Sequence, residues 1–424
     1  MAKFLQYFRA GIAIAVGVLS VLAFCGLFYK IQIFDIQITS LFQNIIINFS
    51  FFTLILLSGI ILLTLLFGRV YCSTLCPLGL YQEFLMLLFR RKNKMSDSRP
   101  YKYFLAALTF GILFGGSAYL VRLIDPYTLF GSALSGTWFG LGFIACLSVI
   151  VWFKGRIFCT NICPVGAILG LIAKFSLCKM YIKNDSCVAC GLCAAKCPTG
   201  SIDYKNHTIN NETCIKCFKC LSGCKRNSIY YGLPQRPKVE FNLNRRKLLI
   251  GGAAAALFVL AIKDGKELAK ITAAKVKKAI LPAGAQSPEQ FANHCLNCNL
   301  CVQNCPMKII KKANKDCSTV HIEYNDGFCD YNCNKCSQIC PSGALKPLTL
   351  AEKQKTQIAV ASTDEEICIS CGFCVETCPR QAVSLKRGEF PQFNPDICIG
   401  CGKCKSICPV KAISVKPIAK QRIL

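Results

Sequence analysis

The sequence predicts a multi-domain protein in which an α-helical membrane bundle of four spans, with a fifth linking span, is joined to small α+β modules rich in cysteine. Two features of the composition indicate this. Of the 424 residues, 53% are hydrophobic and only 17% are charged, which excludes an ordinary soluble enzyme domain. The chain also has 32 cysteines. Most of them recur at three- or four-residue spacing beside proline, which is typical of metal or cluster ligands and not of a disulfide framework.

The charge balance and the few histidines exclude two further classes of protein. Lysine and arginine number 50 against 22 acidic residues, a formal net charge of +28. The basic residues are scattered, however, and form no stripe that would line a nucleic-acid groove, so we expect no nucleic-acid partner. Three histidines and no Cys-x-x-Cys-His motif exclude a bis-histidine haem in the membrane and covalent c-type haem.

The membrane spans are predicted from four runs without charged residues, at 10–29, 36–68, 103–121 and 126–153. Each run contains the ~20 apolar residues that a spanning helix needs. Because the second and fourth runs are too long for one helix, we place their spans near 49–67 and 137–153. Basic residues gather between the second and third spans, so both ends of the bundle are expected in the cytoplasm. Residues 1–177 are thus predicted to be a multi-pass domain of the cell inner membrane.

A twelve-residue pattern occurs twice, after the second and the fourth span. It reads GRVYCSTLCPLG at 68–79 and GRIFCTNICPVG at 155–166, which predicts two helix pairs related by duplication. Cysteines four residues apart share a face of a helix. The four cysteines of the two copies are therefore candidates for one thiolate-bound cofactor or redox site: Cys72, Cys76, Cys159 and Cys163. The alternative is a packing motif of small sulfur-containing residues.

Six cysteine quartets follow the bundle. Five have the spacing Cys-x2-Cys-x2-Cys-x3-Cys, the fourth has one extra residue in its first gap, and all but the second are followed by proline. In chain order they are Cys187, Cys190, Cys193 and Cys197; Cys214, Cys217, Cys220 and Cys224; Cys295, Cys298, Cys301 and Cys305; Cys329, Cys333, Cys336 and Cys340; Cys368, Cys371, Cys374 and Cys378; and Cys398, Cys401, Cys404 and Cys408. Cys317 falls outside them and is not expected to be a ligand.

Each quartet is predicted to bind a [4Fe-4S] cluster, so the α+β modules are expected to be ferredoxin modules of the bacterial 2[4Fe-4S] type. In such modules three cysteines of a quartet bind one cluster and the fourth binds the neighbouring cluster. The exchange predicts that Cys224 joins the first cluster and Cys197 the second, and the last two quartets are paired in the same way. Nested pairing, outermost with outermost, is an alternative for the last four quartets. Zinc ribbons would show cysteine pairs separated by long spacers instead.

The two groups of quartets predict a cytoplasmic two-cluster domain at 178–240 and a periplasmic four-cluster domain at 291–424. Between them, Arg245-Arg246 precedes a weakly hydrophobic run of 15 residues. This pattern predicts a twin-arginine-like export signal that is retained as a fifth span at 241–263. A buried helix or an ordinary membrane anchor is the alternative. Residues 264–290 begin rich in lysine and are expected to be an interfacial helix and linker.

With these motifs the chain resembles two families joined end to end. Residues 1 to about 240 resemble NapH, the membrane quinol dehydrogenase component of periplasmic nitrate reductase systems, in the four spans, the paired Cys-x3-Cys-Pro motifs and the two-cluster module. The remainder resembles NapG, its exported four-cluster ferredoxin partner, in the twin-arginine start and the longer Cys329 to Cys333 spacing. Similar modules occur in the nitrous oxide reductase regulator and methylamine utilisation ferredoxin families. The fusion and the missing proline after Cys224 depart from the pattern.

The resemblance implies a quinol dehydrogenase subunit that oxidises a quinol, with menaquinol expected, and passes electrons through its clusters to a periplasmic reductase or cytochrome acceptor. Such a site must also accept protons, and the bundle has no histidine. The candidate bases are Asp35, Glu83 and, preferred, Asp125. A helix-ending Asp-Pro turn is the alternative role for Asp125. The alternative function is electron donation for maturation or maintenance of a periplasmic metalloenzyme, without turnover of the quinol pool.

Overall fold

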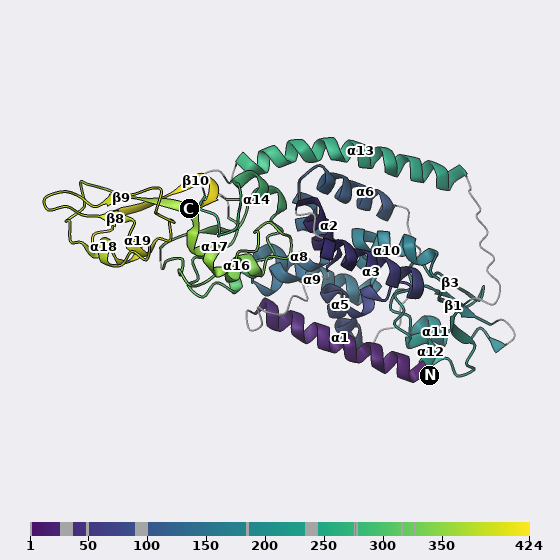
Figure 1. The fold of residues 1–424 in the computed structure, drawn as a ribbon. Helices are drawn as coiled ribbons and strands as arrows, with labels where there is room; N and C mark the ends of the chain where they lie inside the picture. Colours follow the sequence, from purple (N-terminus) through teal and green to yellow (C-terminus); the bar gives the residue numbers. More distant parts are fainter. Residues whose placement is uncertain are drawn as a thin grey trace. The chain divides into compact units, whose positions relative to one another are not determined.

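The computed structural model describes residues 2–25, 37–47, 51–89, 101–183, 186–233, 245–274, 276, 279–314, 317–325 and 327–424. The chain forms two compact units. Unit 1 comprises Met1–Ala23, Ile33–Gly115 and Leu120–Gly265. Unit 2 comprises Phe24–Gln32, Gly116–Tyr119 and Lys266–Leu424. The ribbon of Figure 1 follows the chain from purple at the N-terminus to yellow at the C-terminus.

In the first part of the chain, up to Lys174, every element that the structure describes is a helix (Figure 1). Its helices are α1 (Ala2–Phe24), α2 (Ile38–Ile47), α3 (Phe51–Phe67), α4 (Tyr71–Thr74), α5 (Pro77–Phe89), α6 (Tyr101–Phe114), α7 (Tyr119–Ile124), α8 (Pro126–Leu134), α9 (Trp138–Lys154), the π-helix η2 (Phe158–Ile162) and α10 (Pro164–Lys174). Proline starts α5, α8 and α10, where its fixed φ suits the first turn and its missing N–H is not needed. Their common core contains both copies of the twelve-residue repeat.

The first two quartets lie in a small α+β module that belongs to unit 1. Its elements are β1 (Lys179–Ile182), α11 (Leu192–Ala195), β2 (Ile202–Asp203), β3 (Thr208–Ile209), α12 (Lys219–Gly223) and β4 (Ile229–Gly232). β1 pairs antiparallel with β4, and β2 pairs antiparallel with β3. The two ends of the module are therefore tied together, with both cysteine quartets between them. Its core also receives Leu5 of α1.

Unit 2 repeats this design twice. After α13 (Arg245–Ala274) its elements are α14 (Pro288–His294), α15 (Leu300–Gln303), β5 (Ile310–Lys311), β6 (His321–Ile322), α16 (Lys335–Gln338), α17 (Leu350–Lys355), β7 (Thr356–Thr363), α18 (Phe373–Glu376), β8 (Val383–Ser384), β9 (Gln392–Phe393), α19 (Lys403–Ile407) and β10 (Ile413–Ile423). β5 pairs with β6, β8 with β9 and β7 with β10, all antiparallel. β7 contributes Ala359 to the core around the third and fourth quartets and Ala361 to the core around the last two. This strand therefore joins the two modules.

The quartet loops share one backbone conformation. Except in the quartet that begins at Cys329, the second and fourth residues after the first cysteine have positive φ, at Ala189 and Gly191, Lys216 and Phe218, Asn297 and Asn299, Ser370 and Gly372, and Gly400 and Gly402. The third residue after the last cysteine has positive φ in every quartet, at Gly200, Asn227, Lys308, Gly343, Gln381 and Lys411. Alternating left- and right-handed residues turn successive N–H groups inward and form a concave anion site. The repeated conformation therefore suits an anionic cluster.

The four predicted spans are not found as four long helices. Among the described residues, Phe4–Phe24 of α1 is long and apolar enough to cross a membrane, and α8 with α9, bent by 114°, makes one further candidate. Helix α3 has 17 residues, or about 26 Å of helix, which is less than the ~30 Å hydrocarbon core. The predicted third span ends as a helix at Phe114, before the turn at Gly116, whose φ is +91°. A charge-free run does not show where such turns interrupt it.

The predicted fifth span and linker form one helix. α13 has 30 residues and continues past residue 263 through the lysine-rich stretch, because lysine, glutamate and alanine are good helix formers. The boundary between the two units falls within it, at Gly265. Residues 241–244 and the side chains of Arg245 and Arg246 lie outside what the structure describes.

Candidate iron–sulfur sites

The first module brings the cysteines of its two quartets together in exchanged groups. One cavity is lined by three cysteines of the first quartet and the last cysteine of the second, namely Cys187, Cys190, Cys193 and Cys224. The second group has the complementary membership, because the strongest electrostatic interactions of the Cys220 thiol are with Cys217, Cys214 and Cys197, ahead of the one with Cys193. The arrangement is the one that ligand exchange predicts.

In unit 2 the third and fourth quartets exchange members in the same way. The strongest electrostatic interactions of the Cys301 thiol are with Cys295, Cys298 and Cys340, ahead of the one with Cys336. The Cys336 thiol interacts with Cys329, Cys333 and Cys305. Adjacent quartets are therefore paired, and the described residues do not show the nested arrangement that the sequence left as an alternative.

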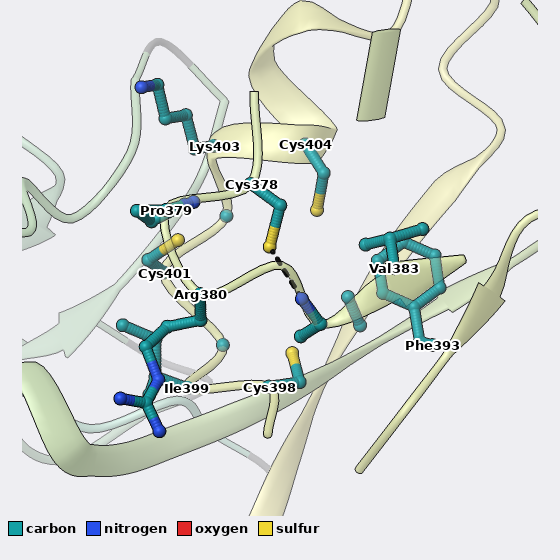
Figure 2. Close-up of a pocket in the computed structure, with 14 residues that line it drawn as sticks. Cys378, Pro379, Arg380, Val383, Phe393, Cys398, Ile399, Cys401, Lys403 and Cys404 are labelled. Atoms are coloured by element: carbon teal, nitrogen blue, oxygen red, sulfur yellow. Dashed lines mark hydrogen bonds between the residues drawn. The ribbon is translucent and has the colours of Figure 1, made fainter. Parts of the chain in front are cut away.

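Figure 2 shows one group of the last two quartets, in which the sulfurs of Cys378, Cys398, Cys401 and Cys404 face a common space. The backbone N–H of Ala382 donates to Cys378 Sγ at 3.3 Å. The last cysteines of three further quartets, Cys197, Cys224 and Cys408, accept the same bond from the fourth residue after them. Hydrogen bonds to ligand sulfurs are one means of tuning a cluster's reduction potential.

The donor sets fit cubane clusters. A mononuclear site holds all its sulfurs at about 2.3 Å from one atom, whereas a cubane has one thiolate on each of four iron corners. In the part of the chain that the structure describes, no group of three or more His, Cys, Asp or Glu side chains is placed to hold one ion. The cysteines instead surround a shared cavity. Each group would supply four thiolates to one [4Fe-4S] cluster.

The four cysteines of the twelve-residue repeat are buried together in the helical core. The Cys163 thiol interacts electrostatically with Cys159, Cys76 and Cys72. The sequence predicted this convergence but placed each pair on one helix face. Instead, Cys76 precedes α5 and Cys163 caps α10 in an extended conformation. The cause is the proline that follows each of them, which disfavours helical geometry in the residue before it.

The two copies of the repeat pack alike around their glycines. A Cβ atom at Gly79 would lie 2.6 Å from the carbonyl oxygen of Cys72, and one at Gly166 would lie 2.5 Å from that of Cys159. Only glycine allows the helix after each Cys-Pro pair to approach the first cysteine so closely. The equal contacts support the predicted duplication.

Two buried arginines, Arg69 and Arg156, accompany the four cysteines, and the sequence interpretation did not single them out. Arg69 donates to the Cys159 carbonyl oxygen at 3.0 Å and lies 3.6 Å from Cys72 Sγ. Arg156 donates to the carbonyl oxygen of Gly79, so each arginine reaches into the other copy. Nε of both, and Nη1 of Arg156, have no hydrogen-bond partner among the described residues. Because such donors are costly to bury without a partner, they fit a site that holds an anionic thiolate cluster. The Gly-Arg pair at the start of each copy of the repeat is the sequence feature that could have indicated these two arginines.

Glu83 connects the helices to the first module. Its carboxylate accepts two hydrogen bonds from Arg9 at 2.8 Å and pairs with Lys219 of α12 at 2.8 Å and Arg156 at 3.6 Å. Three cations therefore surround this carboxylate and favour its ionised form. The role of Glu83 as a base stays a prediction.

Asp125 is the N-cap of α8. Its carboxylate accepts hydrogen bonds from the N–H groups of Tyr127 and Thr128 and from the hydroxyls of Thr128 and Thr39. The structure thus gives Asp125 the turn role that the sequence offered as the alternative, and its role as a base stays a prediction. Asp35 lies outside the described residues.

Cys317, which the sequence left outside the quartets, is buried beside His321 in unit 2. The His321 ring contacts Glu323 Oε1 at 2.9 Å. Contact with Cys317, and then with Glu323, raises the pKa of His321 to about 9. This group belongs to none of the cysteine groups described above.

Families of iron–sulfur domains match several parts of the chain. A 4Fe-4S binding domain family matches residues 49–96 and 136–182, which contain the two copies of the repeat. Families described as 4Fe-4S dicluster domains match 179–225, 210–309 and 361–415. The chain therefore contains several 4Fe-4S ferredoxin-type domains. The quartet that begins at Cys329 lies outside these ranges, so the predicted number of six clusters is not confirmed.

Curated relatives include ferredoxin-type proteins, a putative electron transport protein and a regulatory protein. The methylamine utilization ferredoxin-type protein MauN of Paracoccus denitrificans is 32% identical over 142 residues, 31% of this chain and 48% of that protein. The putative electron transport protein YccM of Escherichia coli K12 is 28% identical over 163 residues, 34% and 46% of the two chains. The regulatory protein NosR of Pseudomonas aeruginosa is 28% identical over 152 residues, 32% and 21% of the two chains.

The chain spans about half the length of the curated relatives it matches. The predicted resemblance to the methylamine utilisation ferredoxin family is confirmed, whereas the joined NapH and NapG families are not. Iron–sulfur electron transfer is thus the function that the relatives and the domain families support.

Proposed function

We propose that this chain is a membrane-embedded subunit that oxidises menaquinol and delivers the electrons to a periplasmic reductase or cytochrome acceptor. Oxidation of one quinol yields one quinone, two electrons and two protons, and the protons are released to water. Bound [4Fe-4S] clusters would each carry one electron at a time. The residues of the chain hold these carriers, compensate their charge and place them close to one another.

The observation that carries this proposal is the contact between the four-cysteine site and the first module. Cys217, of the second quartet, lies in the same buried core as the four cysteines of the repeat. Arg69 touches both parts, since it donates to the carbonyl oxygen of Glu212 at 3.0 Å and lies against Cys72 Sγ. A redox group in the helical part would therefore adjoin the group built around Cys214.

The surface of the helical part supports a location in the membrane. Phe4 of α1, Phe51 of α3 and Trp138 of α9 are 70%, 72% and 92% exposed, and many of their apolar neighbours are also exposed. Apolar patches of this kind mark surfaces that contact protein or lipid. We propose that these helices lie in the inner membrane, with the module at 178–240 in the cytoplasm and residues 291–424 in the periplasm.

The proposal is tested with the full chain, purified anaerobically in detergent. A water-soluble menaquinol analogue should bleach the visible absorption of the clusters to a large part of the extent that dithionite reaches. Bleaching by dithionite but not by any quinol would contradict the proposal. That result would favour the alternative, a reductant for maturation or maintenance of a periplasmic metalloenzyme that does not turn over the quinol pool.

A further inference from the structure

Each helix that follows a Cys-Pro pair borders an apolar cavity, and equivalent residues line the two cavities. On α5 they are Leu80, Tyr81, Phe84 and Leu87. On α10 they are Ala167, Ile168, Leu171 and Lys174. Both sets stand three, four, seven and ten positions after the proline, on one face of each helix. The duplication that produced the cysteine repeat therefore produced a pair of related cavities as well.

The cavity beside α10 is the larger, at about 800 Å³ against about 540 Å³ for the one beside α5. It lies between α10, α6 and α13, and small residues leave the space open, among them Ala106, Ala107, Gly251, Ala254 and Ala255. Cavities of about 300 to 1,000 Å³ with apolar walls and a few polar groups are typical of small-molecule sites.

One end of the α10 cavity is polar. The hydroxyl of Tyr103 donates to Glu212 Oε1 at 2.6 Å, and that carboxylate also pairs with Lys102. The Tyr103 oxygen keeps lone pairs that can accept a hydrogen bond from a ligand hydroxyl. Lys174 lines the same cavity and supplies a donor for a ligand oxygen. The site thus suits an amphipathic molecule with a polar ring and a long apolar tail.

The polar end also adjoins the redox groups. The Glu212 carbonyl oxygen accepts from Arg69 Nη1, and Nη2 of the same guanidinium lies against Cys72 Sγ. Glu212 stands two residues before Cys214. A ring bound at Tyr103 would therefore be linked through Glu212 and Arg69 to the four-cysteine site and through Glu212 to the group that contains Cys214.

The polar groups of the α5 cavity are already engaged with one another. Both oxygens of Glu83 receive hydrogen bonds or ion pairs from Arg9, Arg156 and Lys219. The hydroxyl of Tyr81 is bonded to Ser148 Oγ at 2.9 Å. The apolar walls of this cavity are similar to those of the α10 cavity, but three cations surround the Glu83 carboxylate, whereas Glu212 pairs with Lys102 and Tyr103. The α5 cavity is therefore the matched control.

We propose that the cavity between α6, α10 and α13 binds the quinol, with its ring at Tyr103 and its isoprenoid tail along the alanine-rich walls. The proposal rests on the proposed function, because it assigns a place to that function's substrate. The acyl chain of a phospholipid would fill the apolar part of the cavity without using the Tyr103 hydroxyl.

The test uses the full chain with an azido-quinone photolabel and, separately, with the menaquinol analogue. Ala107→Trp fills the α10 cavity and should abolish labelling of α6, α10 and α13 and most of the quinol-dependent bleaching. Ala10→Trp, in the α5 cavity, should leave both within about twofold. Iron content and bleaching by dithionite should stay unchanged in both variants.

Tyr103→Phe is a second variant that tests the site even if Ala107→Trp disturbs folding. Removing one hydrogen bond should weaken quinol binding about three- to tenfold, while Tyr81→Phe should not. Equal effects of the two tryptophan variants, or no effect of Tyr103→Phe, would overturn the assignment of the quinol to this cavity without contradicting quinol oxidation. No effect of Tyr103→Phe is the result expected if the cavity holds a lipid chain. Specific labelling at Tyr103 with no bleaching of the unmodified protein would instead reject the proposed function and keep the binding site.

Discussion

At the residue scale, Arg156 is expected to set the potential of the four-cysteine site. Removing a buried positive charge makes reduction less favourable, because reduction adds negative charge. At ~8 Å and an effective dielectric constant of about 20, the interaction is about 2 kcal/mol, or about 100 mV for one electron. Arg156→Met should therefore shift the midpoint potential of this site to more negative values by that order in a redox titration. The potentials of the unit 2 clusters serve as internal references, and an unchanged potential would show that no redox group lies beside Arg156.

Two substitutions of Asp125 distinguish a structural role of this residue from a catalytic one. Asparagine caps helices about as well as aspartate, whereas loss of a capping side chain costs about 1 kcal/mol. We expect Asp125→Ala to lower the melting temperature and Asp125→Asn to keep it. If Asp125 is the general base, Asp125→Asn should also slow quinol-dependent bleaching by about 10² with iron content unchanged. A rate within about twofold of the unmodified protein would leave Asp125 the capping role alone.

His321 gives unit 2 a pH-dependent contribution to stability. Contact with Cys317 and Glu323 raises its pKa from 6.5 to about 9, so the folded chain binds the proton more tightly than the unfolded chain. The contribution is therefore complete below pH ~6.5 and is lost as the pH rises towards about 9. The difference in melting temperature between the unmodified protein and His321→Gln should be largest near pH 6 and vanish at alkaline pH. A difference that grows with pH would contradict this assignment.

At the element scale, the glycines after the two Cys-Pro pairs should be intolerant of substitution. Gly79→Ala and Gly166→Ala place a methyl group 2.6 and 2.5 Å from a backbone carbonyl oxygen, so α5 or α10 must shift away from the four cysteines. We expect each change to remove the spectral contribution of that site and to lower the melting temperature. Gly59→Ala is the matched control, because its Cβ would meet nothing within 4 Å and alanine favours a helix. Wild-type spectra in all three variants would argue against the packing described here.

The elements also show which features the sequence could predict. Ligand exchange between adjacent quartets follows from local cysteine spacing, and the structure groups Cys224 with the first quartet as expected. The break of the helix at Cys163 has a local signal too, because the proline that follows it outweighs the i, i+4 spacing of the two cysteines. The contacts of Arg69 and Arg156 cross from one copy of the repeat to the other. Nothing in the spacing within one copy could indicate them.

At the scale of the whole molecule, the length of an apolar run is the least reliable predictor of where a helix begins and ends. Residues 103–121 contain no charge, yet the helix ends at Phe114 and a new one begins at Tyr119. At the predicted linker the composition changes but the helix does not end: the change from apolar to lysine-rich residues near residue 263 does not interrupt α13. Composition predicts whether a segment lies in an apolar or a polar environment. The positions of turns depend on single glycine and proline residues and on tertiary packing.

The cysteines of this chain are expected to hold a series of [4Fe-4S] clusters. Iron and acid-labile sulfide, measured per chain in anaerobically purified protein, test this expectation most directly. The six quartets predict about 24 of each, and a cluster at Cys72, Cys76, Cys159 and Cys163 would add about four. In that case Cys72→Ser should lower the count by about four. Fewer than about 16 iron atoms per chain in protein purified without exposure to oxygen would contradict the account.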